Sequence, residues 1–191
     1  MKEIDRKKLA YLIGLAIGDG NLTNPNGRAT RLRITCDNKY PHLIENIALT
    51  MQELFPKNKV SFIHRKDNCV DISCYSNGLE KLLGWRARHG SKFEQKVSVP
   101  LWILENNELA AYCLRGLFET DGSVYNDRGY VMVNFVTIIP ILSENVSRMI
   151  SNIGFSPNIQ VFHPKTGKTK YTIRISKNSE KFLATLGIDK S

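Results

Sequence analysis

The chain has 191 residues, of which 42% are hydrophobic, enough to bury the core of one domain or of two small halves. Its 27 Lys and Arg exceed its 18 Asp and Glu, and the resulting net charge of +9 predicts a polyanionic partner. No apolar run is long enough to span a bilayer, and the four cysteines lack CxxC spacing, which argues against a membrane protein, a disulfide scaffold and a metal-thiolate site.

The first predicted helix covers residues 6–19 and ends in the segment LIGLAIGDG, residues 12–20. Its apolar side chains recur at helical spacing, and it contains two glycines four residues apart, Gly14 and Gly18. Glycine inside a helix costs about 1 kcal/mol relative to alanine, so this pair indicates that a second backbone approaches closely. We expect Gly20 to end the helix as a left-handed cap.

A half-buried strand with a basic outward side is predicted at residues 29–36. Apolar and polar residues alternate along it, and Arg31, Arg33 and Thr35 lie on the outward side. The remaining elements of the first half are a helix at 42–55, strands at 59–64 and 69–75, and a short helix at 77–83. The charged segment 85–100 closes with a proline and is predicted to be a linker, so the first half comprises residues 1–84.

Residues 101–191 repeat this order of elements. Their first long helix ends in LRGLFETDG, residues 114–122, a near copy of the first motif; Asn107 is expected to cap its start and Gly122 its end. The elements that follow are a strand at 130–136, a helix at 141–153, strands at 158–163 and 170–176, and a helix at 178–186. Short extended pieces at 21–27 and 123–129 precede the strands at 29–36 and 130–136, so each half has the order α-β-β-α-β-β-α. This duplication predicts an α+β fold of two pseudo-symmetric halves, each with an antiparallel sheet, joined at the two motif helices.

Each motif helix carries an aspartate at its C-terminal end, Asp19 or Asp121, where the helix dipole disfavours a carboxylate. If the two helices pack together, like charges meet, and a cation between them would relieve the repulsion. Mg²⁺ prefers oxygen ligands and commonly uses only one or two protein carboxylates. A single Asp-Gly pair is explained equally well by a helix end followed by a turn, but two copies at matched positions favour a metal site.

These paired motifs resemble the signature of the LAGLIDADG homing endonucleases in their single-chain, two-motif form. The resemblance implies that Asp19 and Asp121 bind a catalytic Mg²⁺, with Mn²⁺ or Ca²⁺ able to substitute for binding. We expect the main-chain carbonyls of Gly18 and Thr120 to complete the coordination. Glu119 occupies an earlier acidic position of the motif that the first copy lacks, so it is expected to have an auxiliary role at most.

The resemblance also implies a lysine or polar group near the metals that organises water. Lys92 and Lys96, at the end of the first half, are the candidates, and a solvated linker is the alternative interpretation of both. The four histidines are dispersed and lack metal-ligand spacing, so they offer no competing site.

The outward strand positions and the loops beside them are rich in basic and amide side chains. Arg and Lys suit guanine edges and phosphates, Asn and Gln suit adenine, and a β-ribbon fits the major groove. A solvated sheet face would show the same alternation, but the resemblance implies saddle-shaped sheets that lie along double-stranded DNA. The candidate DNA-binding residues are Asn26, Arg28, Arg31, Arg33, Thr35, Arg65, Ser73, Arg128, Asn134, Gln160, Lys165, Lys168, Lys170, Thr172 and Arg174.

The expected function is that of a monomeric homing endonuclease, encoded in an intron or intein, that makes a staggered double-strand break. Two non-identical halves imply an asymmetric target of about two helical turns. Two alternatives use the same scaffold: an RNA maturase that binds intron RNA and assists splicing, and a DNA-binding protein that does not cut. No membrane partner and no targeting signal are expected, which predicts an intracellular protein of the cytoplasm, the nucleoid or a host organelle.

Overall fold

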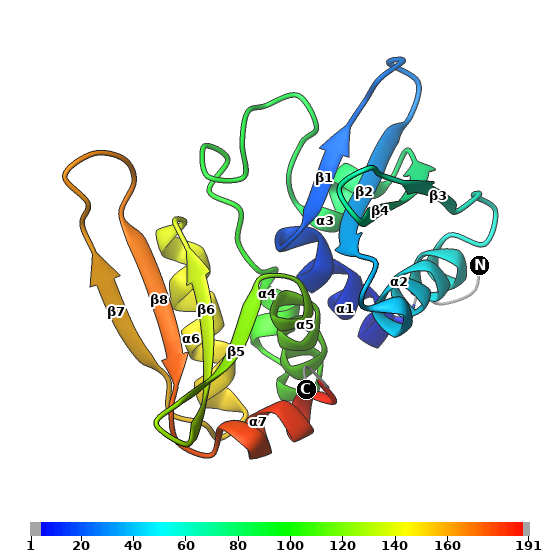
Figure 1. The fold of residues 1–191 in the computed structure, drawn as a ribbon. Coiled ribbons are helices and arrows are strands. Elements are labelled where there is room, and N and C mark those ends of the chain that lie inside the picture. The colour runs from blue at the N-terminus through cyan, green and yellow to red at the C-terminus, as the bar shows by residue number, and fades with distance from the viewer. Residues whose placement is uncertain (1–4, 189–191) are drawn as a thin grey trace.

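The computed structural model describes residues 5–188 and shows two similar halves on either side of a central pair of helices (Figure 1). The first half consists of α1 (Arg6–Ile17), β1 (Gly20–Thr23), β2 (Thr30–Asp37), α2 (Pro41–Leu54), β3 (Ser61–His64), β4 (Cys69–Ser76) and α3 (Leu79–Leu83). The second consists of α4 (Leu101–Leu104), α5 (Asn107–Thr120), β5 (Gly122–Asp127), β6 (Tyr130–Thr137), α6 (Pro140–Asn152), β7 (Asn158–Phe162), β8 (Lys170–Ile175) and α7 (Ser179–Leu186). The predicted element order is confirmed, with the single turn α4 as an addition before the second motif helix.

Each half contains one four-stranded antiparallel sheet, and the two sheets have the same topology. Their strand orders are β1-β2-β4-β3 and β5-β6-β8-β7. The registers also match, because Gly20 pairs with Ile34 in the first sheet and Gly122 pairs with Phe135 in the second. The predicted α+β fold of two pseudo-symmetric halves is therefore confirmed, and Ile34 and Phe135 occupy equivalent positions.

The motif helices α1 and α5 pack against each other along their length at the centre of the molecule (Figure 1). A Cβ atom added to Gly14 would overlap the carbonyl oxygen of Cys113, and one added to Gly116 would overlap that of Tyr11. Glycine is required at both positions because the neighbouring backbone takes up the space of a side chain. The expectation that these residues allow a close approach of two helices is confirmed.

Two expectations about helix ends are wrong. Gly20 and Gly122 do not adopt a left-handed conformation; they are the first residues of β1 and β5. The chain passes from helix to strand so abruptly that a Cβ atom on Gly122 would lie 2.7 Å from the Cα atom of Phe118. Glycine is needed there for space, and no positive φ is involved.

The N-terminal cap of α5 is Asn106, one residue before the predicted Asn107. Asn106 has an extended backbone, and its side chain accepts a hydrogen bond of 3.0 Å from the amide of Leu109. Asp5 caps α1 in the same manner through the amides of Lys7 and Lys8. Both motif helices therefore start at a side chain that satisfies otherwise unpaired amide groups.

The core of each half lies between the inward side of its sheet and the helices. In the second half, the ring of Phe118 on α5 packs against Phe135 of β6 and Phe182 of α7, with centroid distances of 5.7 and 5.2 Å. These contacts join α5 to the sheet that follows it and to α7. None of the helices in residues 5–188 is long and apolar enough to cross a membrane.

Candidate functional site

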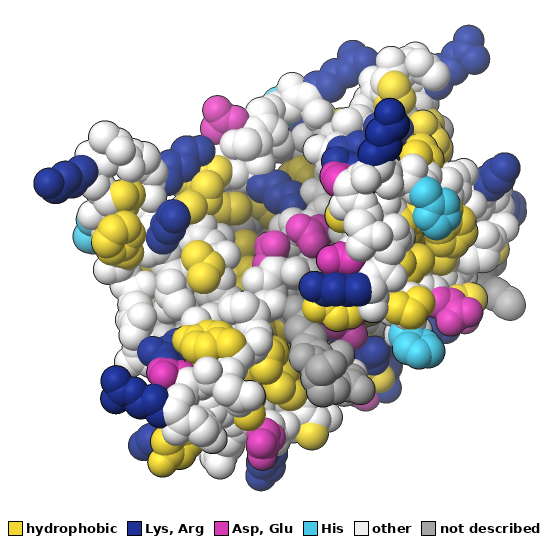
Figure 2. Space-filling view, in the orientation of Figure 1, with side chains coloured by type: hydrophobic (Ala, Val, Ile, Leu, Met, Phe, Trp, Pro, Cys, Tyr) yellow, Lys and Arg dark blue, Asp and Glu magenta, His cyan; other side chains and the backbone are white. Residues whose placement is uncertain are grey.

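The C-terminal ends of α1 and α5 lie side by side, and each is followed directly by its aspartate. A Cβ atom built on Gly18 would lie 3.4 Å from Oδ2 of Asp121, so this carboxylate stands beside the residue that precedes Asp19. Both aspartates are exposed. Figure 2 shows acidic side chains gathered where the two halves meet, with Lys and Arg side chains on the protruding parts around them. The predicted approach of the two helix ends is what the structure shows.

The Lys92 side chain reaches the ends of α1 and α5 from the joining segment, residues 85–100, which connects the two halves. Its Nζ atom donates hydrogen bonds to the carbonyl oxygens of Ile17 and Gly18, at 2.7 and 2.5 Å. Burial lowers the pKa of Lys92 to about 8, although the nearby carboxylates of Asp121 and Asp19 favour its charged form. A cationic group thus sits at the negative end of α1, between the two acidic residues.

A cavity of about 460 Å³ opens beside these groups. Its lining residues come from the end of α1, from Asp121, from the joining segment, from the β6–α6 connection and from the β7–β8 loop. Lys168 of that loop places its Nζ atom 3.8 Å from the ring centroid of Phe93, so the joining segment and the second sheet meet across the cavity. Lys92 lines this cavity and Lys96 does not; Lys96 is exposed and has a left-handed φ of 50°.

The joining segment, predicted as a linker, has a defined structure of its own. The Gln95 side chain accepts a hydrogen bond from the amide of Arg86 and donates to the carbonyls of Arg86 and Gly90. Arg88 donates a hydrogen bond of 2.8 Å to the carbonyl of Asn24, in the loop between β1 and β2. These contacts hold the segment against the first sheet and fix the position from which Lys92 enters the site.

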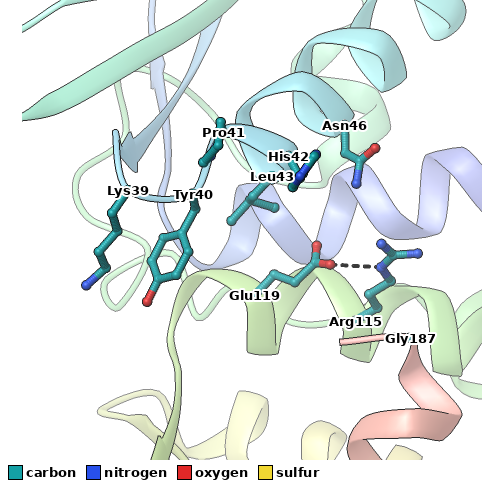
Figure 3. A pocket seen from close by; sticks show the side chains of 9 residues that line it. All are labelled: Lys39, Tyr40, Pro41, His42, Leu43, Asn46, Arg115, Glu119 and Gly187. Atoms are coloured by element: carbon teal, nitrogen blue, oxygen red, sulfur yellow. Dashed lines mark hydrogen bonds and ion pairs between the residues drawn. The ribbon is translucent and has the colours of Figure 1, made fainter. Parts of the chain in front are cut away.

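Glu119, the other acid of the second motif, occupies a different environment. It accepts hydrogen bonds from the Tyr11 hydroxyl, at 2.5 Å, and from Nε of Arg115, at 2.8 Å. Its side chain is 10% exposed and faces a separate pocket bordered by the start of α2, including Tyr40 and Leu43 (Figure 3). Glu119 therefore joins the two motif helices, whereas Asp121 stands at their ends.

This difference predicts that Glu119→Gln lowers stability and leaves the expected DNA cleavage in place. Losing the charge weakens two hydrogen bonds to a buried group, which should reduce the free energy of unfolding by about 1–3 kcal/mol. Thermal unfolding and cleavage of a DNA substrate below the melting temperature measure the two effects. Tyr11→Phe, which removes one of the two hydrogen bonds, should lose a smaller amount. Loss of cleavage in a folded Glu119→Gln protein would show that Glu119 acts in catalysis.

The outward side of the first sheet carries an ion-pair network centred on Asp71. Asp71 is only 6% exposed, and its carboxylate contacts Arg33 at 3.5 Å, Arg65 at 3.7 Å and the hydroxyl of Thr35 at 2.7 Å. These contacts hold two of the predicted DNA-binding arginines in place. Ser73 lies on the same side but is covered by its neighbours, with 5% exposure, and its role in DNA binding stays a prediction.

The outward side of the second sheet carries fewer charges. Asn134 donates from its amide nitrogen to the Tyr125 hydroxyl at 3.2 Å, and Arg174 lies 3.5 Å from a carboxylate oxygen of Asp127. The other predicted residues of this side and of the hairpin loops are at least partly exposed: Arg31, Thr172, Lys170, Gln160, Asn26, Arg28, Arg128, Lys165 and Lys168. The structure therefore brings the candidate residues onto the outward faces and loops of both sheets.

Four buried polar atoms on these faces and loops lack a hydrogen-bond partner within residues 5–188. They are Oδ1 of Asn24, Nε of Arg33, Oδ1 of Asn134 and Nε of Arg174. Buried polar atoms are nearly always paired in folded proteins, so unsatisfied ones mark places where a ligand or water completes the bonding. All four belong to the outward strand positions or the β1–β2 loop, where a ligand or water molecules would complete their hydrogen bonds.

Residues 108–187 match the family model of the LAGLIDADG-like domain. The match covers most of the second half of the chain, from the start of α5 to the end of α7. The resemblance of the paired motifs to this family is thereby confirmed. A comparison with curated protein sequences finds no match.

Solved structures with the same fold extend the similarity over both halves. The crystal structure of I-DmoI in complex with DNA and Mn gives a TM-score of 0.69 at 23% identity and covers 97% of this chain and 99% of that chain. I-DmoI in complex with DNA and Ca gives 0.67 at 22% identity, with 96% and 91% covered. The N-terminal LAGLIDADG domain of DUF199/WhiA gives 0.63 at 13% identity, with 100% and 87% covered. Both LAGLIDADG motifs of this chain thus lie in the fold that these proteins share.

Proposed function

We propose that this chain is a monomeric, site-specific DNA endonuclease, encoded in an intron or intein, that hydrolyses one phosphodiester bond in each strand of a long duplex target. The observation that carries the proposal is the meeting of Asp19 and Asp121 at the ends of two packed helices, beside the partly buried ammonium of Lys92. Two sheets with basic outward faces flank that meeting point.

The similarity to I-DmoI, a homing endonuclease solved with DNA and with Mn or Ca, supports this proposal. The same fold also forms the N-terminal domain of DUF199/WhiA, so the fold by itself does not imply cleavage. The acidic pair supports cleavage, since two carboxylates that would face a polyanion repel it unless they hold a cation.

The residues at the helix ends fit a divalent cation with hard oxygen ligands. Asp19 and Asp121 offer carboxylates, and the ends of α1 and α5 offer the carbonyls of Gly18 and Thr120. The Lys92 ammonium already bonds to the Gly18 carbonyl, which shows that this place favours positive charge. Within residues 5–188 no group of three or more His, Cys, Asp or Glu side chains could hold a metal, so water and phosphate oxygens would complete the coordination of Mg²⁺.

A bound divalent cation would activate a water molecule and neutralise charge that develops on the phosphate. The chain itself contributes three things. The two aspartates would hold cations at the junction of the halves, the Lys92 ammonium would add a positive charge close to them, and the outward faces of the sheets would hold the duplex across both helix ends.

Cleavage of plasmid DNA that carries the intron-free host locus tests this function. We expect a staggered double-strand break with Mg²⁺ and none with EDTA, because the aspartates alone do not supply an activated water. The matched control is a plasmid with the intron-containing locus, in which the target is interrupted. Absence of cleavage with Mg²⁺, together with tight binding to intron RNA, would contradict the endonuclease and favour an RNA maturase.

A further inference from the structure

The two sheets present different chemistry at equivalent positions. Because Ile34 and Phe135 are equivalent in register, the residues that precede them, Arg33 and Asn134, are equivalent as well. By the same register, Arg31 is equivalent to Met132. The outward sequence Arg31, Arg33, Thr35 on β2 therefore corresponds to Met132, Asn134, Val136 on β6. The first series has two positive charges and the second has none.

Arg33 and Asn134 each have an unsatisfied polar atom at the same place in their sheet. Nε of Arg33 and Oδ1 of Asn134 are both buried without a hydrogen-bond partner in the described part of the chain. Arginine and asparagine differ in chemistry, yet each leaves a polar atom unpaired at this place in its sheet. The unpaired atom is therefore a property of the position and not of one residue type. A ligand that lies along both sheets would meet both positions in the same orientation.

A neighbouring side chain restrains each of these two residues. The buried carboxylate of Asp71 holds the Arg33 guanidinium from one side at 3.5 Å, and Arg65 and Thr35 fix that carboxylate in turn. The Tyr125 hydroxyl accepts a hydrogen bond from the Asn134 amide nitrogen, which leaves the amide oxygen as a free acceptor. Restrained polar side chains of this kind suit the recognition of base edges better than the general attraction of phosphates.

The two residue types prefer different bases in the major groove. An arginine donates two hydrogen bonds to N7 and O6 of guanine, whereas an asparagine accepts from N6 and donates to N7 of adenine. Apolar side chains such as Met132 and Val136 contact the methyl group of thymine, and the exposed fraction of Val136 is 45%. At these equivalent positions β2 therefore suits G·C pairs and β6 suits A·T pairs.

We propose that the two half-sites of the DNA target carry different, predictable bases at symmetry-related base pairs. The half-site on the first sheet carries guanine at the base pair that Arg33 faces, and the half-site on the second sheet carries adenine at the symmetry-related base pair, which Asn134 faces. The half-sites differ in the same manner at a second pair of positions, where Arg31 faces guanine and Met132 faces thymine. This inference rests on the proposed function, because it assumes that duplex DNA lies along both sheets.

Reciprocal substitutions test the inference by giving each position the residue of its counterpart. The full chain, its Arg33→Asn variant and its Asn134→Arg variant are each used in Ca²⁺ to select bound duplexes from a library randomised over about two helical turns. Arg33→Asn should convert guanine to adenine at one base pair, and Asn134→Arg should convert adenine to guanine at its symmetry mate. Each substitution should change the ratio of the binding affinities for two duplexes that differ only at that base pair by about 5- to 150-fold. Arg148→Asn, an exposed position of α6, is the control that removes a charge without touching either sheet face.

The outcomes separate this inference from the function on which it rests. If the unmodified chain selects no sequence, both fail. If it selects a sequence that is then cut with Mg²⁺ but the two substitutions leave every base preference unchanged, the inference alone fails. A third variant, Met132→Arg, keeps the inference testable if one of the first two variants does not fold, because it should independently convert thymine to guanine in the second half-site. Thermal unfolding identifies a variant that has lost its structure.

Discussion

Asp121→Asn is expected to abolish double-strand cleavage while leaving duplex binding largely intact. The carboxylate stands at the end of α5 beside the backbone of Gly18, in the place where the two halves meet. The amide retains the size of the side chain but lacks the charge that would hold a divalent cation, so cleavage should fall by about three orders of magnitude or more. Binding should persist because the proposed contacts to bases come from the sheets and not from the helix ends. Single-turnover cleavage and gel-shift titration measure the two effects separately.

The corresponding change in the first half, Asp19→Asn, should have the same effect, since the two aspartates hold equivalent places. Glu119→Gln is the matched control: it removes an acid two residues from Asp121 that joins α1 and α5 through Tyr11 and Arg115. The control should cut at a normal rate when folded. Full cleavage by either Asp variant, or a loss of binding that equals the loss of cleavage, would contradict the metal-binding role.

Much of the fold could be predicted from the sequence because it is encoded twice. The alternation around Ile34 recurs around Phe135, and the small residues at Gly14 and Gly116 recur in the two motif helices. A pattern that would be ambiguous in one copy becomes specific when a second copy has the same spacing. The aspartates were identified for the same reason, since each ends a motif helix at a matched position.

Residues that act through pairing across strands could not be identified in this way. Alternation places Asp71 on the outward side of β4, but its contact with Thr35 and Arg33 depends on the register between β4 and β2. Register is set by turns and by the packing of a whole sheet, and neither can be read from the spacing within one strand. Sequence reasoning therefore found the arginines and missed the carboxylate that holds them.

For a similar reason, the sequence could not distinguish between the two candidate lysines. Lys92 and Lys96 lie in one segment without helical or strand periodicity, so their directions depend on how that segment folds. The Gln95 side chain ties the segment to Arg86 and Gly90. The turn that results directs Lys92 to the helix ends and leaves Lys96 at the surface.

Lys92→Met is expected to lower the rate of cleavage by about 10²- to 10³-fold, the range for loss of one preorganised group that stabilises developing charge. The Lys92 ammonium is removed from solvent, bonds to the carbonyls of Ile17 and Gly18, and lies close to both aspartates. A positive charge in such a place stabilises the charge that develops on the phosphate more strongly than one in water. Methionine fills much of the same volume without the charge. The rate constant of cleavage should therefore fall while the dissociation constant for duplex DNA stays nearly unchanged.

Lys96→Met is the matched control, because it removes the same charge from the same segment at an exposed position outside the cavity. It should cut at the normal rate. Lys92→Met also leaves two carbonyl oxygens without their donor, so its thermal unfolding must be measured, and Lys92→Arg should restore part of the rate by returning a cation to the site. Normal cleavage by a folded Lys92→Met protein, or a loss confined to Lys96→Met, would remove Lys92 from the catalytic site and leave it as a residue that only ties the joining segment to α1.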